Sequence, residues 1–196
     1  MLPLFEPSLP PGFHYRADFI SREEEAALIE SISEIEFSEF EMRGVVARRR
    51  VAFFGRSYDA VPGPEKPIPE FLSGIRDRLA EWAGVAPAAF AMALINEYRE
   101  AAPIGWHRDA PQYDIVAGLS LLAKCRMKLR PYVVPRLRAA NTGGATARQA
   151  PRKTTHEIEL QPRSAYLITG EARQAYEHSI PPVESLRYSI TFRTLR

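Results

Sequence analysis

From residue 91 to its end, the chain is a succession of short β-strand candidates separated by loops. Each candidate is rich in β-branched, aromatic or alternating apolar residues, and turn-forming residues divide it from the next. Short strands at this spacing are typical of a sandwich or a barrel. We predict strands at residues 91–99, 114–122, 125–133, 155–160, 164–169 and 186–194.

The first half of the chain predicts two helices with strands between them, and helices followed by strands predict an α+β domain. Residues 21–24 (Ser-Arg-Glu-Glu) form a capping-box pattern, and residues 37–54 predict strands that end at Gly55. Gly84 suits the end of the second helix, and Pro69 its first turn. The expected core residues are Ala26, Leu28, Ile29 and Ile32 in the first helix, and Phe71, Leu72, Ile75, Leu79 and Trp82 in the second.

Composition narrows the class of protein. The chain has 196 residues, enough for one domain with a sizeable core, and its formal net charge of +2 permits a polyanionic partner without arguing for one. The single cysteine, Cys125, excludes an intramolecular disulfide and fits a reducing compartment. The N-terminus lacks the pattern of a signal peptide, and no apolar run reaches membrane-spanning length. We therefore expect a cytoplasmic, monomeric protein that does not enter a membrane.

Three residues form a possible metal site. His107 and Asp109 are two positions apart, so both would point to the same side of a strand. His178 follows 69 residues after Asp109 (178 − 109 = 69), which leaves room for several strands of a barrel. Two histidines and one carboxylate on one face form the facial triad of non-haem Fe(II) oxygenases. The alternative without a metal is a surface histidine beside an ordinary charged turn.

A strand close to the C-terminus carries two arginines on one face. Positions 187, 189, 191 and 193 share one parity, and we expect the other four to face the core. An arginine that points into a barrel is costly unless it is paired, and a carboxylate ligand would remove that cost. The core-facing set would be Leu186, Tyr188, Ile190 and Phe192.

These segments together resemble the AlkB-like family of 2-oxoglutarate/Fe(II) dioxygenases. The resemblance covers residues 96–98 (Asn-Glu-Tyr), 106–109 (Trp-His-Arg-Asp), 119–121 (Leu-Ser-Leu), His178 and 187–193, with a weaker match at residues 53–58. It implies a double-stranded β-helix (jelly roll) catalytic core over residues 91–196. Residues 1–90 would then be an N-terminal extension, packed on the core, with helices and a β-rich substrate lid.

The resemblance also implies roles for individual residues and a set of cofactors. The cofactors would be Fe(II), 2-oxoglutarate as co-substrate, and O2. Arg193 lies six residues after Arg187, roughly 20 Å along an extended strand, so only its long side chain or strand curvature would bring it near the metal. The implied iron ligands are His107, Asp109 and His178, and the implied 2-oxoglutarate-binding residues are Asn96, Tyr98, Arg187 and Arg193.

The activity that the resemblance implies is oxidative demethylation of alkylated DNA or RNA. Basic residues at Arg48, Arg49, Arg50 and Arg56, and cations of a predicted loop at 135–153 (Arg136, Arg138, Arg148, Arg152 and Lys153), would contact phosphates. Phe53, Phe54 and Tyr58 would stack a flipped base.

Other interpretations stay open. The basic strand and the 135–153 loop fit solvated surface equally well. Many family members that act on alkylated bases have an acidic residue two positions after the ligand aspartate, where this chain has Pro111. The alternatives are a hydroxylase or demethylase of proteins or small molecules, and a nucleic-acid-binding module without turnover.

Overall fold

The computed structural model describes residues 9–42, 45–56, 66–133 and 154–196. The helices and 3-10 turns are α1 (Arg22–Ser33), η1 (Glu70–Leu72), α2 (Ser73–Ala83), η2 (Pro87–Ala89) and α4 (Gly170–Ala175). The strands are β1 (Phe13–Arg16), β2 (Ser38–Met42), β3 (Val45–Gly55), β4 (Phe90–Tyr98), β5 (Ile104–His107), β6 (Tyr113–Leu121), β7 (Cys125–Pro131), β8 (His156–Leu160), β9 (Ala165–Ile168), β10 (Tyr176–Ile180) and β11 (Arg187–Leu195).

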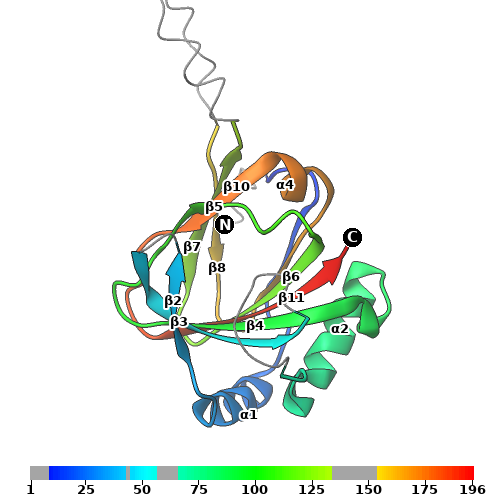
Figure 1. The fold of residues 1–196 in the computed structure, drawn as a ribbon, viewed down its shortest axis with the longest axis vertical. Coiled ribbons are helices and arrows are strands. Elements are labelled where there is room, and N and C mark those ends of the chain that lie inside the picture. Colours follow the sequence, from blue (N-terminus) through cyan, green and yellow to red (C-terminus); the bar gives the residue numbers. More distant parts are fainter. Residues whose placement is uncertain (1–8, 43–44, 57–65, 134–153) are drawn as a thin grey trace, which may run out of the picture.

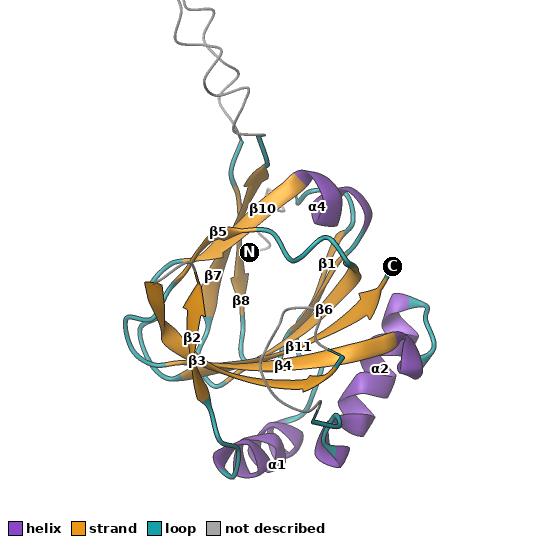
Figure 2. Ribbon diagram, viewed as in Figure 1, coloured by secondary structure: helices purple, strands orange, loops and turns teal. Residues whose placement is uncertain are grey.

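The strands form two antiparallel sheets (Figures 1 and 2). The larger sheet has the order β1-β9-β6-β11-β4-β3-β2, and the smaller one has the order β5-β10-β7-β8. Apolar side chains from both sheets pack in one cluster, which includes Tyr98 of the larger sheet and Met127 and Leu129 of the smaller one. The fold is therefore the predicted α+β jelly roll. All six strands predicted after residue 91 are present, with ends within two residues of those observed.

Helices α1 and α2 cover the outer face of the larger sheet, away from the smaller sheet (Figure 2). The Ser21 hydroxyl accepts a hydrogen bond from the backbone N–H of Glu24, and the Glu24 carboxylate accepts one from the backbone N–H of Ser21, so the predicted capping box is present. Leu28 and Ile32 are buried against the sheet. The prediction for Ala26 was wrong, because Ala26 lies on the exposed side of α1. Gly84 ends α2 in the left-handed conformation, with φ 70°.

Side-chain alternation gives the larger sheet two different faces. On β11, Ile190 and Phe192 pack in the cluster beneath the helices, as predicted. Arg187 and Arg193, of the opposite parity, are buried on the other face. Leu186 does not face the core as expected: it precedes the strand and is 42% exposed.

Strands from residues 1–90 complete the larger sheet. β3 pairs with β4, and β1 pairs with β9. The predicted division of the chain at residue 90 stays a prediction. The predicted loop at 135–153, with its five cations, lies outside the described residues. Among the described helices, none is long and apolar enough to cross a membrane.

Candidate metal centre

A cavity of about 270 Å³ lies between the two sheets. Its size is close to the lower end of small-molecule sites, roughly 300 Å³. Strands β3, β4 and β11 of the larger sheet form one side, and β5 and β10 of the smaller sheet contribute the other. His107, Asp109 and His178 all line this cavity, so the fold brings the three predicted metal ligands to one place.

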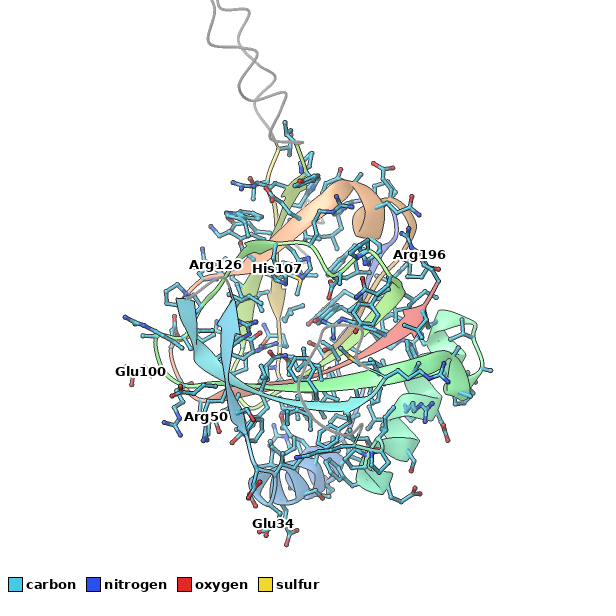
Figure 3. The ribbon with its side chains drawn as sticks, in the orientation of Figure 1. Glu34, Arg50, Glu100, His107, Arg126 and Arg196 are labelled. Carbon is cyan, nitrogen blue, oxygen red and sulfur yellow. The ribbon has the colours of Figure 1, made fainter. Side chains whose placement is uncertain are left out.

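The two histidines lie opposite each other on neighbouring strands. His178 of β10 and His107 of β5 are direct partners in the antiparallel ladder, and their ring centroids are 4.3 Å apart. Directly opposed residues in an antiparallel pair point to the same face, and here that face borders the cavity. Figure 3 shows His107 on β5, at the side of the smaller sheet that faces the larger one. The 68 residues between Asp109 and His178 thus supply the strands that close the barrel.

Both imidazoles have lone pairs available at neutral pH. The Nδ1 atom of His107 lies 2.9 Å from the carbonyl oxygen of Gly105, a contact that requires Nδ1–H and leaves Nε2 as the unprotonated nitrogen. Burial lowers the pKa of His107. Burial, followed by the neighbouring His107, lowers the pKa of His178 to about 3. Neutral imidazole is the form that binds metals.

Asp109 lies in the segment that follows β5, and not inside that strand as the spacing predicted. Its side chain is 5% exposed, and Oδ2 lies 3.8 Å from Nε2 of His178. Burial alone would raise the pKa of the Asp109 carboxyl, but the Arg193 guanidinium, together with His178 and His107, outweighs burial and holds that pKa well below its usual range. The carboxylate is therefore ionised, as a metal ligand requires.

Arg173 holds the backbone that carries Asp109, a role that the sequence did not indicate. Its Nη2 donates hydrogen bonds to the carbonyl oxygens of Asp109, Ala110 and Tyr113, at 3.3, 2.6 and 2.8 Å. Arg173 belongs to the short helix α4, just before β10, and is 3% exposed. Arg173 belongs to no recognised sequence motif, so only its burial and these contacts identify it as a positioning residue.

Arg193 reaches the centre through its side chain, one of the two routes that the sequence allowed. Its Nε and Nη2 lie 2.8 and 2.7 Å from Oδ1 of Asp109. Two donors on one oxygen leave Oδ2 on the side of His178. Arg193 thus orients the carboxylate and keeps it charged.

Arg187 is fully buried, with 0% exposure, at the other end of the same strand face. Its Nε donates to the Ser120 hydroxyl at 3.2 Å, and its guanidinium lies 5.0 Å from the ring centre of Tyr98. Both Nη atoms make no hydrogen bond with any described residue. A buried guanidinium with two unsatisfied nitrogens fits a carboxylate ligand, which would accept from both.

Asn96 and Tyr98 line the cavity from β4, on one strand face as predicted. The amide of Asn96 is already engaged at both ends. Its Oδ1 accepts from Nε of Arg49 at 3.2 Å, and its Nδ2 donates to the Ser189 hydroxyl at 3.3 Å. Asn96 is thus part of a polar network across three strands, and Tyr98 lies beneath Arg187.

The three candidate ligands lie near one another, but their donor atoms are not yet at the distances of a metal site. Among the described residues, no three His, Cys, Asp or Glu side chains form a ready metal cluster. Two neighbouring ligands of one ion, each about 2.1 Å from it at a right angle, lie about 3 Å apart. The 3.8 Å between Asp109 and His178 exceeds this by less than about 1 Å. Small rotations of these two side chains would therefore bring both donors onto one ion, and the chemistry of the three residues fits Fe(II).

The basic strand does not form the continuous phosphate-binding surface that the sequence suggested. Arg48 is exposed, but Arg49 is 8% exposed and lines the cavity. Arg50, on the opposite face of β3, forms a two-pronged ion pair with Glu97, at 2.9 and 2.8 Å. Strand alternation explains the difference, because neighbouring residues point to opposite faces. Figure 3 shows Arg50 well away from His107.

Two of the aromatic residues predicted to stack a base, Phe53 and Phe54, point to opposite faces of β3. Phe53 lines the cavity, while Phe54 is buried in the cluster beneath the helices and cannot stack on a base there. Arg56 is exposed. Tyr58 and the cations at Arg136, Arg138, Arg148, Arg152 and Lys153 lie outside the described residues.

Comparisons with known proteins identify the family of this chain. A sequence model of the 2OG-Fe(II) oxygenase superfamily matches residues 12–193. An "Alkylated DNA repair protein ALKBH8 homolog" of Arabidopsis thaliana is 27% identical over 185 residues, which are 87% of this chain and 51% of that protein. The chain therefore spans about half the length of this relative. An uncharacterized protein of Acanthamoeba polyphaga mimivirus is 25% identical over 203 residues, which are 94% of this chain and 85% of that protein.

Two solved structures share the fold. The structure of OsALKBH1 superposes with a TM-score of 0.71 at 15% identity, over 95% of this chain and 99% of that one. A prolyl-4-hydroxylase of Pseudomonas putida superposes with a TM-score of 0.60 at 12% identity, over 94% of this chain and 93% of that one. At these identities the likeness concerns the fold.

Proposed function

The chain belongs to the 2OG-Fe(II) oxygenase superfamily, and from this membership we propose that it is an AlkB-like dioxygenase that oxidatively demethylates alkylated bases of DNA or RNA. Its cofactors would be Fe(II), 2-oxoglutarate and O2. One observation carries the proposal: Arg187 has two unsatisfied buried nitrogens and lies against Tyr98, which lines the same cavity as His107, Asp109 and His178. A carboxylate-binding arginine and a facial triad are the two parts that such a reaction needs.

The triad residues would hold the metal through Nε2 of His107, the lone pair of His178 and Oδ2 of Asp109. Gly105 fixes the His107 tautomer, Arg193 keeps Asp109 ionised, and Arg173 holds the backbone of Asp109 in place. When bound, iron and 2-oxoglutarate supply an oxidation that inserts oxygen into an N-methyl C–H bond, with succinate, CO2 and then formaldehyde released.

The co-substrate would be bound by the larger sheet. Arg187 would pair with one of its carboxylates through both Nη atoms, while Ser120 and Tyr98 hold the guanidinium in place. Asn96 and Arg193 would complete the polar lining on the metal side. Because these residues belong to paired central strands, β4, β6 and β11, the pocket is pre-organised and needs little reordering on binding.

Nucleic acid as the substrate is supported by the name of one relative and by one aromatic residue of the cavity. The Arabidopsis relative is named as an alkylated DNA repair protein homolog, and Phe53 is part of the cavity lining. Against it, Arg49 and Arg50 point into the protein or to Glu97 and so leave the basic surface smaller than predicted. That observation favours, as the second candidate, a hydroxylase or demethylase of proteins or small molecules on the same scaffold. A binding module without turnover is a third.

Turnover distinguishes the three candidates. Anaerobically iron-loaded protein is given 2-oxoglutarate and O2, with and without a panel of methylated DNA and RNA oligonucleotides, and succinate and formaldehyde are measured. Equal amounts of both products with one oligonucleotide support the proposed demethylase. Succinate without stimulation by any oligonucleotide contradicts the nucleic-acid substrate and directs the search to proteins and small molecules. Absence of succinate in iron-loaded protein contradicts the enzyme itself.

A further inference from the structure

Tyr166 of β9 lies in the cavity wall, and the proposed reaction gives its hydroxyl no role. The side chain is 5% exposed and lines the same cavity as the three candidate metal ligands. Among the described residues, this hydroxyl has no hydrogen-bond partner. A buried polar group normally has one, so a hydroxyl that borders a cavity without a partner indicates a ligand.

Gly118 lets the phenol ring of Tyr166 reach over the neighbouring strand. Gly118 of β6 is the direct partner of Tyr166 in one antiparallel ladder and of Thr191 of β11 in the next. A Cβ at Gly118 would lie 2.5 Å from the hydroxyl oxygen of Tyr166 and closer still to its ring, so the tip of the ring occupies the space of the missing side chain. Val116 has the parity of Gly118 and packs in the cluster between the two sheets, so this space is on the cavity side. The hydroxyl therefore lies above β6, toward the middle of the larger sheet.

Neighbouring residues hold the ring in place. Phe13 of β1 stacks on it, with ring centroids 6.0 Å apart and an angle of 5° between the planes. The backbone of Gly118 lies against its tip. Burial raises the pKa of Tyr166 well above its usual range, so the hydroxyl keeps its hydrogen at neutral pH. Tyr166 thus presents a fixed O–H donor to the cavity.

Two other hydroxyls of this part of the sheet already have partners. Thr191 donates to a backbone carbonyl oxygen of β4 at 3.2 Å and accepts from Nη1 of Arg193 at 3.1 Å. Ser120 accepts from Nε of Arg187 at 3.2 Å. Of these three hydroxyls, the one of Tyr166 is left for a ligand.

The Tyr166 hydroxyl lies near the place where Arg187 would bind a carboxylate. Ser120, which contacts Arg187, follows two residues after Gly118 on the same face of β6, a separation of roughly 7 Å. Tyr98, whose ring centre lies 5.0 Å from the Arg187 guanidinium, lines the cavity together with Tyr166. After burial, the largest influence on the pKa of Tyr166 is the Arg187 guanidinium, which lowers it. One carboxylate between the two side chains would therefore contact both.

We propose that Tyr166 is a further co-substrate-binding residue, whose hydroxyl donates a hydrogen bond to the distal carboxylate of 2-oxoglutarate. The inference rests on the proposed function and adds a residue to its site. The two oxygens of a carboxylate accept up to about four hydrogen bonds, so this group can pair with both Nη atoms of Arg187 and with Tyr166 at once. Gly118 belongs to the same site, because it leaves room for the ring.

Removal of the hydroxyl alone tests the inference. Tyr166→Phe keeps the ring and should raise the Kd for 2-oxoglutarate by about tenfold to a hundredfold, because one hydrogen bond to a charged group is lost. Calorimetric titration of anaerobic, iron-loaded protein measures this Kd without turnover. The Tm of the variant in thermal denaturation should equal or exceed that of the wild-type protein, since no hydroxyl without a partner is buried.

Tyr15→Phe is the matched control. It removes a hydroxyl from β1, the strand next to β9, where Tyr15 is the direct partner of Tyr166. The Tyr15 hydroxyl accepts from the backbone N–H of Gln161 at 3.2 Å, and Tyr15 is not part of the cavity lining. This variant should leave the Kd for 2-oxoglutarate unchanged.

A second ligand shows which end of the co-substrate Tyr166 contacts. 2-Oxopentanoate has the same carbon chain and the same 2-oxo acid end as 2-oxoglutarate, but a methyl group replaces the distal carboxylate. Tyr166→Phe should leave the Kd for 2-oxopentanoate unchanged. An equal rise in the Kd of both ligands would place the hydroxyl at the metal end and contradict the proposal.

Further outcomes separate this inference from the proposed function. Equal Kd values for 2-oxoglutarate in the wild-type protein and in Tyr166→Phe refute the inference alone, because the co-substrate still binds. A marked fall in the Tm of Tyr166→Phe would mean that the hydroxyl has a structural role, and it would overturn the inference as well. Wild-type, iron-loaded protein that binds no 2-oxoglutarate contradicts the proposed function, and the inference with it.

Discussion

Replacement of Arg187 by methionine should separate 2-oxoglutarate binding from protein stability. The change removes a guanidinium that is 0% exposed and whose two Nη atoms make no hydrogen bond with described residues. Methionine fills similar space without polar atoms. The variant should therefore lose the co-substrate while the ligand-free fold is kept.

The magnitude follows from the contacts at this site. Two charge-assisted hydrogen bonds at about 1.5–3 kcal/mol each predict an increase in the Kd for 2-oxoglutarate of at least about a hundredfold. In the ligand-free protein, the variant loses the Ser120 hydrogen bond and the Tyr98 contact but no longer buries unsatisfied donors, which cost about 1–3 kcal/mol each. We expect its free energy of unfolding to be unchanged or up to about 2 kcal/mol higher.

Two assays measure the two effects. Calorimetric titration of anaerobic, iron-loaded protein gives the Kd for 2-oxoglutarate, and urea denaturation without ligand gives the free energy of unfolding. Arg126→Met, on the exposed side of β7, is the control and should change neither quantity appreciably. Unchanged affinity for 2-oxoglutarate, combined with a loss of several kcal/mol of stability, would refute the reasoning and make Arg187 a structural residue.

Three further predictions concern the centre itself. Arg193→Met leaves the buried carboxylate of Asp109 without its partner, so the free energy of unfolding should fall by about 3–5 kcal/mol in urea denaturation. Gly118→Ala places a Cβ 2.2 Å from Cζ of Tyr166 in the cavity wall, so it should cost about 1–3 kcal/mol and reduce turnover in the succinate assay. Because the pKa of His178 is lowered from 6.5 to about 3, the unfolded state takes up its proton first as the pH falls. Metal-free protein should thus lose about 1.4 kcal/mol of stability per pH unit below about 6.5 until roughly pH 3, and His178→Gln should flatten that slope.

Controls distinguish these effects from general damage. Gly74→Ala, in α2, adds a Cβ that meets nothing within 4 Å, so it should be neutral or stabilising by up to about 1 kcal/mol. If Gly118→Ala is equally harmless, Tyr166 does not pack as described. A stability profile that is flat between pH 6.5 and 4 would mean that His178 is accessible to protons in the folded state.

The alternation of side chains explains why much of the fold could be predicted from the sequence. On β11 the two buried faces differ in polarity, and this difference shows as a period of two in the residue order. Strands β4, β6 and β11 were all found with nearly correct ends. The capping box of α1 and the glycine at the end of α2 could also be predicted, because each depends on a few neighbouring residues. Leu186 and Ala26 were assigned to the core wrongly, because periodicity cannot show where an element stops or how wide its covered face is.

The site was predicted only in part, because some of its contacts join neighbours in the sequence and others join distant residues. His107 and Asp109 form a short motif, but the contact of Asp109 with Arg193 depends on side-chain reach across the cavity. Arg173 could not be found, since its role lies in three backbone carbonyls that are distant in sequence. In the sequence, Arg49 and Arg50 belong to one basic cluster, but in the structure they point to opposite faces of β3.

The most direct test of the account is iron-dependent conversion of 2-oxoglutarate to succinate by a matched set of proteins. The wild-type protein, His107→Ala and Asp109→Ala are loaded with Fe(II) anaerobically, exposed to O2 and 2-oxoglutarate, and checked for fold by circular dichroism. The account predicts succinate from the wild-type protein alone, with both variants folded. Succinate formation at wild-type rates by either folded variant would contradict the assignment of the metal centre.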